Sequence, residues 1–203
     1  MKLAKGFLVA LATLMLAVAA PAAAQEQLAW AKGDMALGKA DAPVTVIEYA
    51  SMTCPHCARF HAETFKAFKE KYVDTGKVRM IFREFPFDGL ALRASMLARC
   101  AGPERYFPML EVLFQQQKQW TAAKDPLVAL AQIGRLGGVS QEKFDACMKS
   151  EELSNAIVQN RLEGQQKHGV ESTPTFLIEG EKLTGALTLA QLDEALAKKL
   201  PKS

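Results

Sequence analysis

Strand-like and helix-like hydrophobic patterns alternate in the first part of the chain. Residues 44–50 (VTVIEYA) are mostly apolar or β-branched, follow Pro43, and predict a buried strand. From residue 54 to about residue 72, aromatic side chains recur at near-helical spacing, which predicts a helix with one buried face. Residues 77–85 (KVRMIFREF) then alternate in strand fashion until Pro86. These elements follow one another in the order β-α-β.

The next stretch has a helical composition. Five segments are rich in Ala, Leu, Gln, Glu and Lys, and turn or capping residues such as Gly, Pro, Asp and Ser separate them. These segments are 91–101, 106–117, 126–136, 141–149 and 152–168. Two short strands at 175–178 and 182–184 follow, and then an amphipathic helix at about 189–200.

The two α/β parts can complete one sheet only if the helices are inserted between them. We therefore expect an α/β fold in which residues 25–203 form one domain, with a helical insertion at about residues 89–169. Residues 25–42 are mixed in character and contain glycine, so we expect them to form a lead-in arm.

Residues 1–24 have the pattern of a secretory signal peptide. Lys2 and Lys5 precede an uncharged apolar run at 6–20, and small residues follow Pro21. This run of about 15 residues is shorter than the roughly 20 that span a bilayer, which disfavours a membrane anchor. The predicted cleavage site, after Ala24, has no cysteine, which argues against a lipoprotein. We expect the mature protein in a compartment where disulfides persist.

Composition and charge exclude several classes of protein. The 203 residues are 49% hydrophobic and 23% charged, as in an ordinary globular protein. The 13 glycines and 9 prolines are too few for a collagen-like or low-complexity chain. A formal net charge of +3 gives no nucleic-acid footprint, so we expect no nucleic-acid partner.

The candidate chemistry lies at Cys54-Pro55-His56-Cys57, between the first strand and the helix that follows it. At positions i and i+3 of a first helical turn, two Cα atoms lie about 5 Å apart, within the disulfide range. The positive end of the helix favours a thiolate at Cys54 and lowers its pKa. Pro55 suits the first helical position, and His56 can add positive charge or donate a hydrogen bond toward sulfur. The pattern predicts a redox-active cysteine pair.

The sequence disfavours most other uses of the two cysteines. A structural zinc site lacks a second C-x-x-C or a histidine pair at the right spacing. A c-type haem site needs histidine where Ala58 stands. A structural disulfide stays open, although it is unusual in so short a loop. A copper-binding module could use Met52, Cys54, His56 and Cys57 as soft ligands; we expect no bound metal.

Three segments together resemble the DsbA-like branch of the thioredoxin superfamily: VTVIEYAS, MTCPHCARFH and the later Thr173-Pro174-Thr175-Phe176. The resemblance covers nearly all of the chain after residue 24. It implies a thioredoxin-like fold with an inserted helical domain, and a periplasmic thiol:disulfide oxidoreductase. In such a protein Cys54 is the exposed attacking cysteine and Cys57 the buried resolving one.

Thr173-Pro174 matches the cis-proline loop of this superfamily, which lies against the active-site disulfide. The resemblance therefore predicts a cis peptide bond here. Because proline has no N–H and the backbone turns, the preceding peptide is left free to pair with a substrate chain beside Cys54. Thr173 departs from the valine most associated with the DsbA oxidant and is similar to the isomerase relatives.

Glu48 lies six residues before Cys54 in an otherwise apolar strand, where an acid is costly without a partner. It matches a buried acid in DsbA-like proteins that moves protons to or from the resolving thiol; the alternative is a strand-edge residue that reaches solvent. We expect His61, one turn beyond Cys57, to be an ordinary helix-surface residue, and His168 to lie at a helix C-terminus.

Cys100 and Cys147 both lie in the helical insertion. The tetrapeptide accounts for the other two cysteines, and some DsbA-like proteins carry a similar second pair. We therefore expect a structural disulfide between Cys100 and Cys147. Two buried free thiols are the alternative.

The resemblance implies an oxidant that introduces disulfides into reduced secreted polypeptides, uses no cofactor, and is reoxidised by a membrane partner of the DsbB type. A lowered pKa of Cys54 favours the reduced enzyme and so makes its disulfide oxidising. A disulfide isomerase or reductase of the same fold is the nearest alternative. Isomerases of this family carry an N-terminal dimerisation domain, and only 19 residues separate Ala24 from Val44. We therefore expect a monomer.

Overall fold

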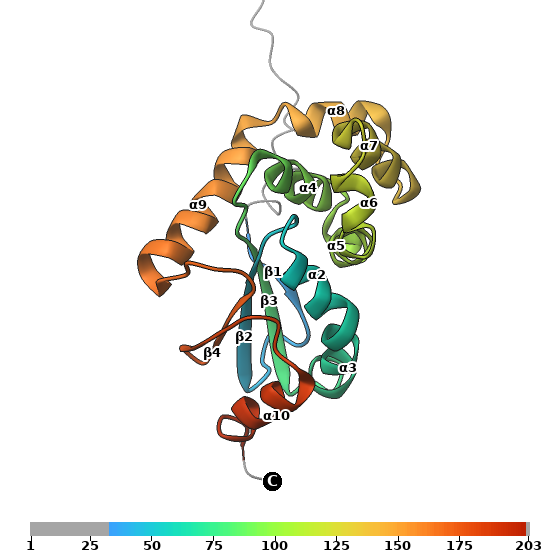
Figure 1. The fold of residues 1–203 in the computed structure, drawn as a ribbon. Helices are drawn as coiled ribbons and strands as arrows, with labels where there is room; N and C mark the ends of the chain where they lie inside the picture. Colours follow the sequence, from blue (N-terminus) through green and yellow to red (C-terminus); the bar gives the residue numbers. More distant parts are fainter. Residues whose placement is uncertain (1–32, 202–203) are drawn as a thin grey trace, which may run out of the picture.

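A five-stranded mixed sheet forms the centre of the computed structural model, which describes residues 33–201 (Figure 1). The predicted signal peptide lies outside these residues. The strand order is β1-β3-β2-β4-β5, with β2 and β3 parallel and the other neighbours antiparallel. The strands are β1 (Met35–Leu37), β2 (Val44–Ala50), β3 (Val78–Glu84), β4 (Thr175–Ile178) and β5 (Glu181–Thr184).

One helical run connects β2 to β3, as the aromatic spacing predicts. Its consecutive parts are α2 (Pro55–Phe60), η2 (His61–Phe65), α3 (Lys66–Phe68) and η3 (Lys69–Val73). The two η segments are π-helical, a wider form that occurs frequently at functional sites. Buried Phe60, Phe65 and Phe68 pack against Val46 and Phe176 of the sheet. The run therefore covers one face of β2, β3 and β4.

Part of the expected lead-in arm forms a strand, β1. It pairs antiparallel with β3, with Met35 opposite Phe82, and Met35 is buried. Three residues are too few to show a period, and the free edge of β3 determines the pairing. The sequence pattern therefore misses this strand.

All helices from α4 to α9 lie between β3 and β4 in the sequence (Figure 1). They are α4 (Gly89–Cys100), the 3-10 turn η4 (Pro103–Arg105), α5 (Tyr106–Gln115), α6 (Gln117–Thr121), α7 (Pro126–Leu136), α8 (Gln141–Met148) and α9 (Glu151–His168). Asp88, Asp125, Ser140 and Ser150 cap four of these helices by accepting backbone N–H groups. His168 ends α9 before Gly169, which has a left-handed φ of 59°, so its expected place at a helix C-terminus is confirmed.

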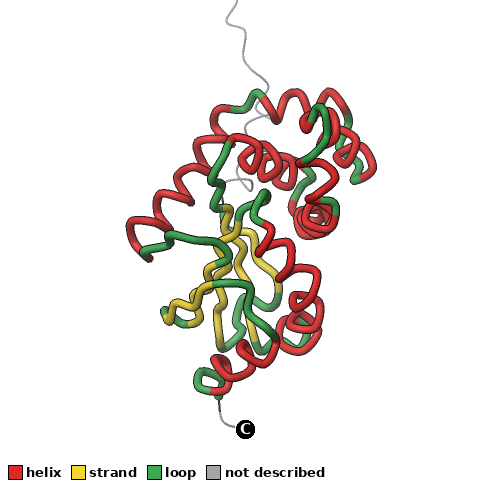
Figure 2. Tube along the Cα trace, in the orientation of Figure 1, coloured by secondary structure: helices red, strands yellow, loops and turns green. Residues whose placement is uncertain are grey.

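The inserted helices cover one end of the sheet, and α9 runs back along its other face (Figures 1 and 2). Gly164 of α9 lies so close to Tyr49 that an added Cβ would be 2.6 Å from the ring. A large buried cluster joins Ala50, Met52 and Cys57 to α4, α5 and α7. The end of β2 that leads to Cys54 thus lies where the sheet meets the insertion.

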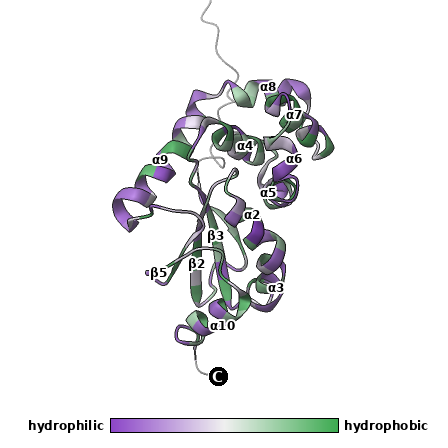
Figure 3. Cartoon of the chain, in the orientation of Figure 1, coloured by the Kyte–Doolittle hydropathy of each residue, from purple (hydrophilic) through white to green (hydrophobic). Residues whose placement is uncertain are grey.

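The last helix, α10 (Leu189–Ala197), begins with a capping box between Thr188 and Gln191 and buries Leu192 and Leu196. Figure 3 shows apolar residues concentrated along β2 and β3 and polar residues along α9. Sheet and helices together confirm the predicted α/β class. Within residues 33–201, no helix combines the length and the hydrophobicity that a membrane span requires.

Candidate active site

Cys54 lies at the N-cap of α2, directly after the turn that follows β2. Its φ of −77° and ψ of 118° are extended, and Pro55 occupies the first helical turn. Cys57 lies one turn later on the inner face of the helix and has no exposed surface, whereas Cys54 is partly exposed. Both thiols are free in the structure. The two sulfurs therefore lie at one helix start but in different surroundings.

The surroundings shift the pKa values of the two thiols in opposite directions. A hydrogen bond from Cys57 and the backbone N–H groups of Cys57 and His56 lower the pKa of Cys54 to about 5, against the opposing effect of burial. Burial and the neighbouring Cys54 raise the pKa of Cys57 well above its ordinary value. At neutral pH the outer sulfur is a thiolate and the inner one a thiol.

The loop before β4 lies against Cys54. The Thr173–Pro174 peptide bond is cis, and both residues are buried. The sulfur of Cys54 lies 3.3 Å from the carbonyl oxygen of Thr173, to which it donates a hydrogen bond in its protonated form. His56, by contrast, is exposed on the first turn of α2. The structure thus brings Cys54, Cys57, Thr173 and Pro174 together, with His56 at the rim.

Glu48 faces the helical run that follows Cys54. Side chains of a strand alternate between faces, and Glu48 shares its face with Val46, which packs against this run. The carboxyl group is fully buried, so the strand-edge alternative does not describe it. Both of its oxygens lie 3.2 Å from Nε2 of His61. The acid therefore has the partner that burial requires.

His61 lies in the core, so the expectation of a helix-surface position is wrong. It follows Cys57 by four residues, and this spacing places both on the same buried face of the helix. Only 1% of its side chain is exposed, and its Nδ1 lies 2.6 Å from Oε1 of Glu111 in α5. Burial alone lowers the pKa of His61, but the charge of Glu48 and the hydrogen bond with Glu111 raise it to about 9.

Two more polar residues near the site have no counterpart among the sequence predictions. Gln117 of α6 is buried and donates to the carbonyl oxygens of Met52, at 2.8 Å, and of Cys54, at 3.0 Å. Glu111 is the only acid in the otherwise apolar helix segment YFPMLEVLF, and that isolation was the available signal. A glutamine in a polar stretch gives no comparable signal.

A buried ion pair also lies beside the site. Arg99 of α4 donates two hydrogen bonds of 2.6 Å to Glu84, at the end of β3, and the hydroxyl of Tyr106 donates to the same carboxyl at 2.8 Å. Ala50 of β2 lies opposite Glu84 in the sheet. This cluster attaches the inserted helices to the reactive end of the sheet.

The other cysteines lie away from this site. Cys100 at the end of α4 and Cys147 of α8 form a disulfide, with 6.4 Å between their Cα atoms. They belong to a small cluster with Met96, Leu153 and Ile157, in the outer part of the insertion. In the described part of the chain, no group of three or more His, Cys, Asp or Glu residues is placed to hold a metal ion.

Known proteins share this architecture. A family model described as Thioredoxin matches residues 31–198. The "Putative protein-disulfide oxidoreductase" of Rickettsia bellii is 32% identical over 173 residues, which are 85% of this chain and 66% of that protein. "Disulfide bond formation protein D" of Bacillus subtilis is 26% identical over 185 residues, which cover 83% of this chain and 78% of the relative. The crystal structure of Wolbachia pipientis alpha-DsbA1 has a TM-score of 0.77 at 33% identity, over 82% of this chain and 90% of the other.

These similarities extend over the sheet and the inserted helices alike. The chain spans 55 to 66% of the length of the two rickettsial relatives that it matches first. The TM-score to alpha-DsbA1 over most of both chains confirms the predicted thioredoxin-like fold. The chain therefore belongs to the thioredoxin family, in its DsbA-like branch.

Proposed function

We propose that this chain is a thiol:disulfide oxidoreductase that acts as an oxidant through Cys54 and Cys57. The observation that carries the proposal is the contrast between a partly exposed sulfur with a pKa of about 5 and a buried one with a raised pKa. Because the thiolate stabilises the reduced pair, the disulfide between these cysteines readily accepts electrons. The names of the relatives from Rickettsia and Bacillus support the same reaction class.

The reaction proceeds in two exchanges. A substrate thiolate attacks Sγ of Cys54, the Cys54–Cys57 bond breaks, and its electron pair goes to Cys57, which takes up a proton. A second substrate thiolate then attacks the substrate sulfur of the mixed disulfide, and Cys54 leaves as a thiolate. The substrate is oxidised to a disulfide and the cysteine pair is reduced. A leaving thiol of low pKa departs faster, which favours the second exchange.

The residues around the pair have separate roles in this proposal. The backbone at Thr173 and Pro174 pairs with the substrate chain beside Cys54. His56 supplies a backbone N–H that stabilises the thiolate. Glu48 supplies and removes the proton of Cys57.

The proposed setting is the periplasm, with reduced secreted polypeptides as substrates and a membrane reoxidase of the DsbB type as the partner that restores the disulfide. Cys100 and Cys147 take no part in the exchange. An isomerase or reductase of the same fold would use the same two cysteines, and Thr173 is the residue that this chain shares with the isomerases. The reduction potential separates these roles.

Trapping of a mixed disulfide tests the assignment of the two cysteines. Cys57→Ser should form one stable adduct with an oxidised peptide at Cys54, detected by mass spectrometry. Cys54→Ser should react roughly 100-fold more slowly at pH 7, because Cys57 then contributes almost no thiolate. Each variant is the matched control of the other. Equal rates of adduct formation in the two variants would contradict the proposal.

A further inference from the structure

Three side chains from three elements form a continuous chain of hydrogen bonds beside Cys57. Glu48 of β2 is fully buried, His61 of η2 is 1% exposed, and Glu111 of α5 is 26% exposed. His61 lies 3.2 Å from the first carboxyl group through Nε2 and 2.6 Å from the second through Nδ1. The chain of contacts therefore begins in the core and ends at a carboxyl group that solvent reaches.

The inner end of this chain lies where the proposed reaction needs a proton. When the Cys54–Cys57 bond opens, Sγ of Cys57 receives an electron pair in a site from which water is excluded. A buried thiolate is costly, so protonation must accompany the opening. The charge of Glu48 acts on Cys57, but Glu48 itself has no exposed surface through which to exchange protons with solvent.

We propose that His61 and Glu111 relay protons between Glu48 and solvent, so that Cys57 gains a proton when the disulfide opens and loses it when the disulfide forms. This inference rests on the proposed thiol exchange. In the opening direction, one proton passes from solvent through Glu111 to Nδ1 of His61, Nε2 of His61 gives its proton to Glu48, and Glu48 gives one to Cys57. The net result is the transfer of one proton from solvent to sulfur, and no group of the relay is oxidised or reduced.

Histidine suits the middle position for chemical reasons. Imidazole can release a proton from one nitrogen while it takes one up at the other, which neither a lysine nor an arginine can do. The titratable groups that face the ring are Glu48 from β2 and Glu111 from α5. The two acidic groups raise the pKa of His61 to about 9, which stabilises the doubly protonated ring that forms between uptake at Nδ1 and release at Nε2.

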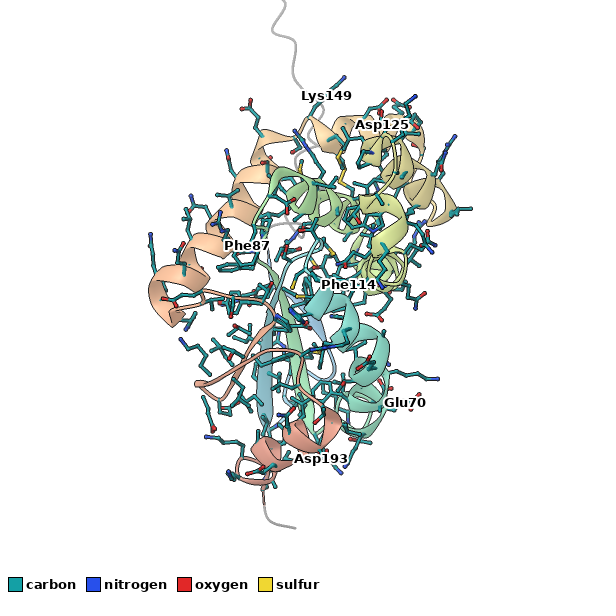
Figure 4. The ribbon with its side chains drawn as sticks, in the orientation of Figure 1. Glu70, Phe87, Phe114, Asp125, Lys149 and Asp193 are labelled. Carbon is teal, nitrogen blue, oxygen red and sulfur yellow. A yellow bond between two sulfur atoms is a disulfide. The ribbon has the colours of Figure 1, made fainter. Side chains whose placement is uncertain are left out.

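The aromatic surroundings fix the ring in the relay orientation. Phe114 stacks on His61 with 4.3 Å between ring centroids and 21° between planes, and Phe65 lies 4.8 Å away. Phe114 follows Glu111 by three residues, so one face of α5 supplies both the outer carboxyl group and the stacking ring. Figure 4 labels Phe114 where α5 meets the helical run that begins at α2.

If His61 and its two acidic partners only stabilise the fold, the rates of disulfide exchange should not depend on Glu111. Substitution of Glu111 therefore distinguishes a proton relay from a structural ion pair. Its partial exposure makes Glu111→Gln and Glu111→Ala tolerable for folding. The matched control is Glu63→Gln, which removes the same charge from an exposed position in the segment that contains His61. The rates to measure are reduction of the disulfide by dithiothreitol and its re-formation with glutathione disulfide, in H₂O and D₂O, from pH 5 to pH 9.

The relay predicts that Glu111→Gln slows both directions by about tenfold or more, the scale of a lost acid–base group. Glu63→Gln should match the wild type. Formate should restore the rate of Glu111→Ala by supplying a carboxylate at the vacated position. Nitrogen-15 NMR should show a different pKa of His61 in oxidised and reduced protein.

Several results would overturn the relay. Equal rates for Glu111→Gln and Glu63→Gln would do so. A slow Glu111→Ala variant that formate does not restore would also do so, because Glu111 would then have only a structural role. Unchanged titration of His61 between redox states would also contradict it. A wild type that exchanges no disulfides would instead refute the proposed function, and the relay with it.

Discussion

At the scale of single residues, the two sulfurs of the active site lie one helical turn apart but differ in exposure to solvent and in the hydrogen bonds that they receive. Cys54 receives hydrogen bonds from Cys57 and from the backbone at the start of α2. Cys57 has no exposed surface and packs against the inserted helices. The position of Cys54 at the start of the helix thus stabilises its thiolate. The same helix buries Cys57.

The first prediction concerns the titration of Cys54. Thiolate absorbance of the reduced protein should show one group with a pKa of about 5, and Cys54→Ser should remove it. This folded-state pKa lies below the ordinary value of 9.0, so the thiolate stabilises the reduced fold. The stabilisation is complete above pH 9 and is lost as the pH falls through about 5. A titration midpoint near 9 would contradict the assignment.

Residue types that carry chemistry by themselves could be predicted, and those that act through packing could not. The cysteine pair and the acid in an apolar strand are visible in the sequence, as is the threonine–proline pair once the family resemblance is known. The core position of His61 follows from its four-residue spacing from Cys57 only once the burial of that cysteine is known. Glu111 and Gln117 reach the site from an insertion whose docking on the sheet no local pattern encodes.

At the scale of elements, α6 acts on the active-site loop through a single side chain. The break between α5 and α6 at Gln116 has φ −97° and ψ 11°, and the indole of Trp120 bridges it with a hydrogen bond of 2.7 Å to Leu113. The sequence predicts one helix over 106–117 here, because its composition favours helix on both sides of the break. The break directs Gln117 toward the carbonyl groups of Met52 and Cys54.

Gln117→Ala should therefore loosen the turn before Cys54. Loss of two hydrogen bonds should lower the free energy of unfolding by about 1–2 kcal/mol, and the rate of dithiol oxidation should fall with it. The matched control is Gln119→Ala on the same short helix, where the side chain is exposed and both quantities should stay unchanged. Chemical denaturation and a peptide-oxidation assay measure the two effects. Equal behaviour of the two variants would show that α6 does not position the loop.

At the scale of the whole molecule, the insertion has its own covalent support. The Cys100–Cys147 disulfide closes a segment of 47 residues that includes α5, α6 and α7. Closure of a loop of this length restricts the unfolded chain and contributes about 4 kcal/mol in the chain-entropy model. The bond lies outside the cluster that contains Cys57.

Replacement of Cys100 and Cys147 by serine should lower the free energy of unfolding by about 2–4 kcal/mol. The rate of peptide oxidation well below the unfolding temperature should change little, because the Cys54–Cys57 surroundings keep their contacts. Denaturation of the oxidised wild type and of the double variant, with the oxidation assay run in parallel, measures both. If the double variant kept the stability of the wild type but lost its oxidation activity, the second disulfide would take part in catalysis.

The reduction potential of the Cys54–Cys57 pair tests the central claim most directly. Equilibration with glutathione buffers of known composition, followed by mass spectrometry of the alkylated protein, gives this potential. The stabilised thiolate of Cys54 predicts a potential above about −180 mV, in the range of strong protein oxidants. A potential near about −270 mV, the range of thioredoxin-type reductants, would contradict an oxidant and leave a reductase.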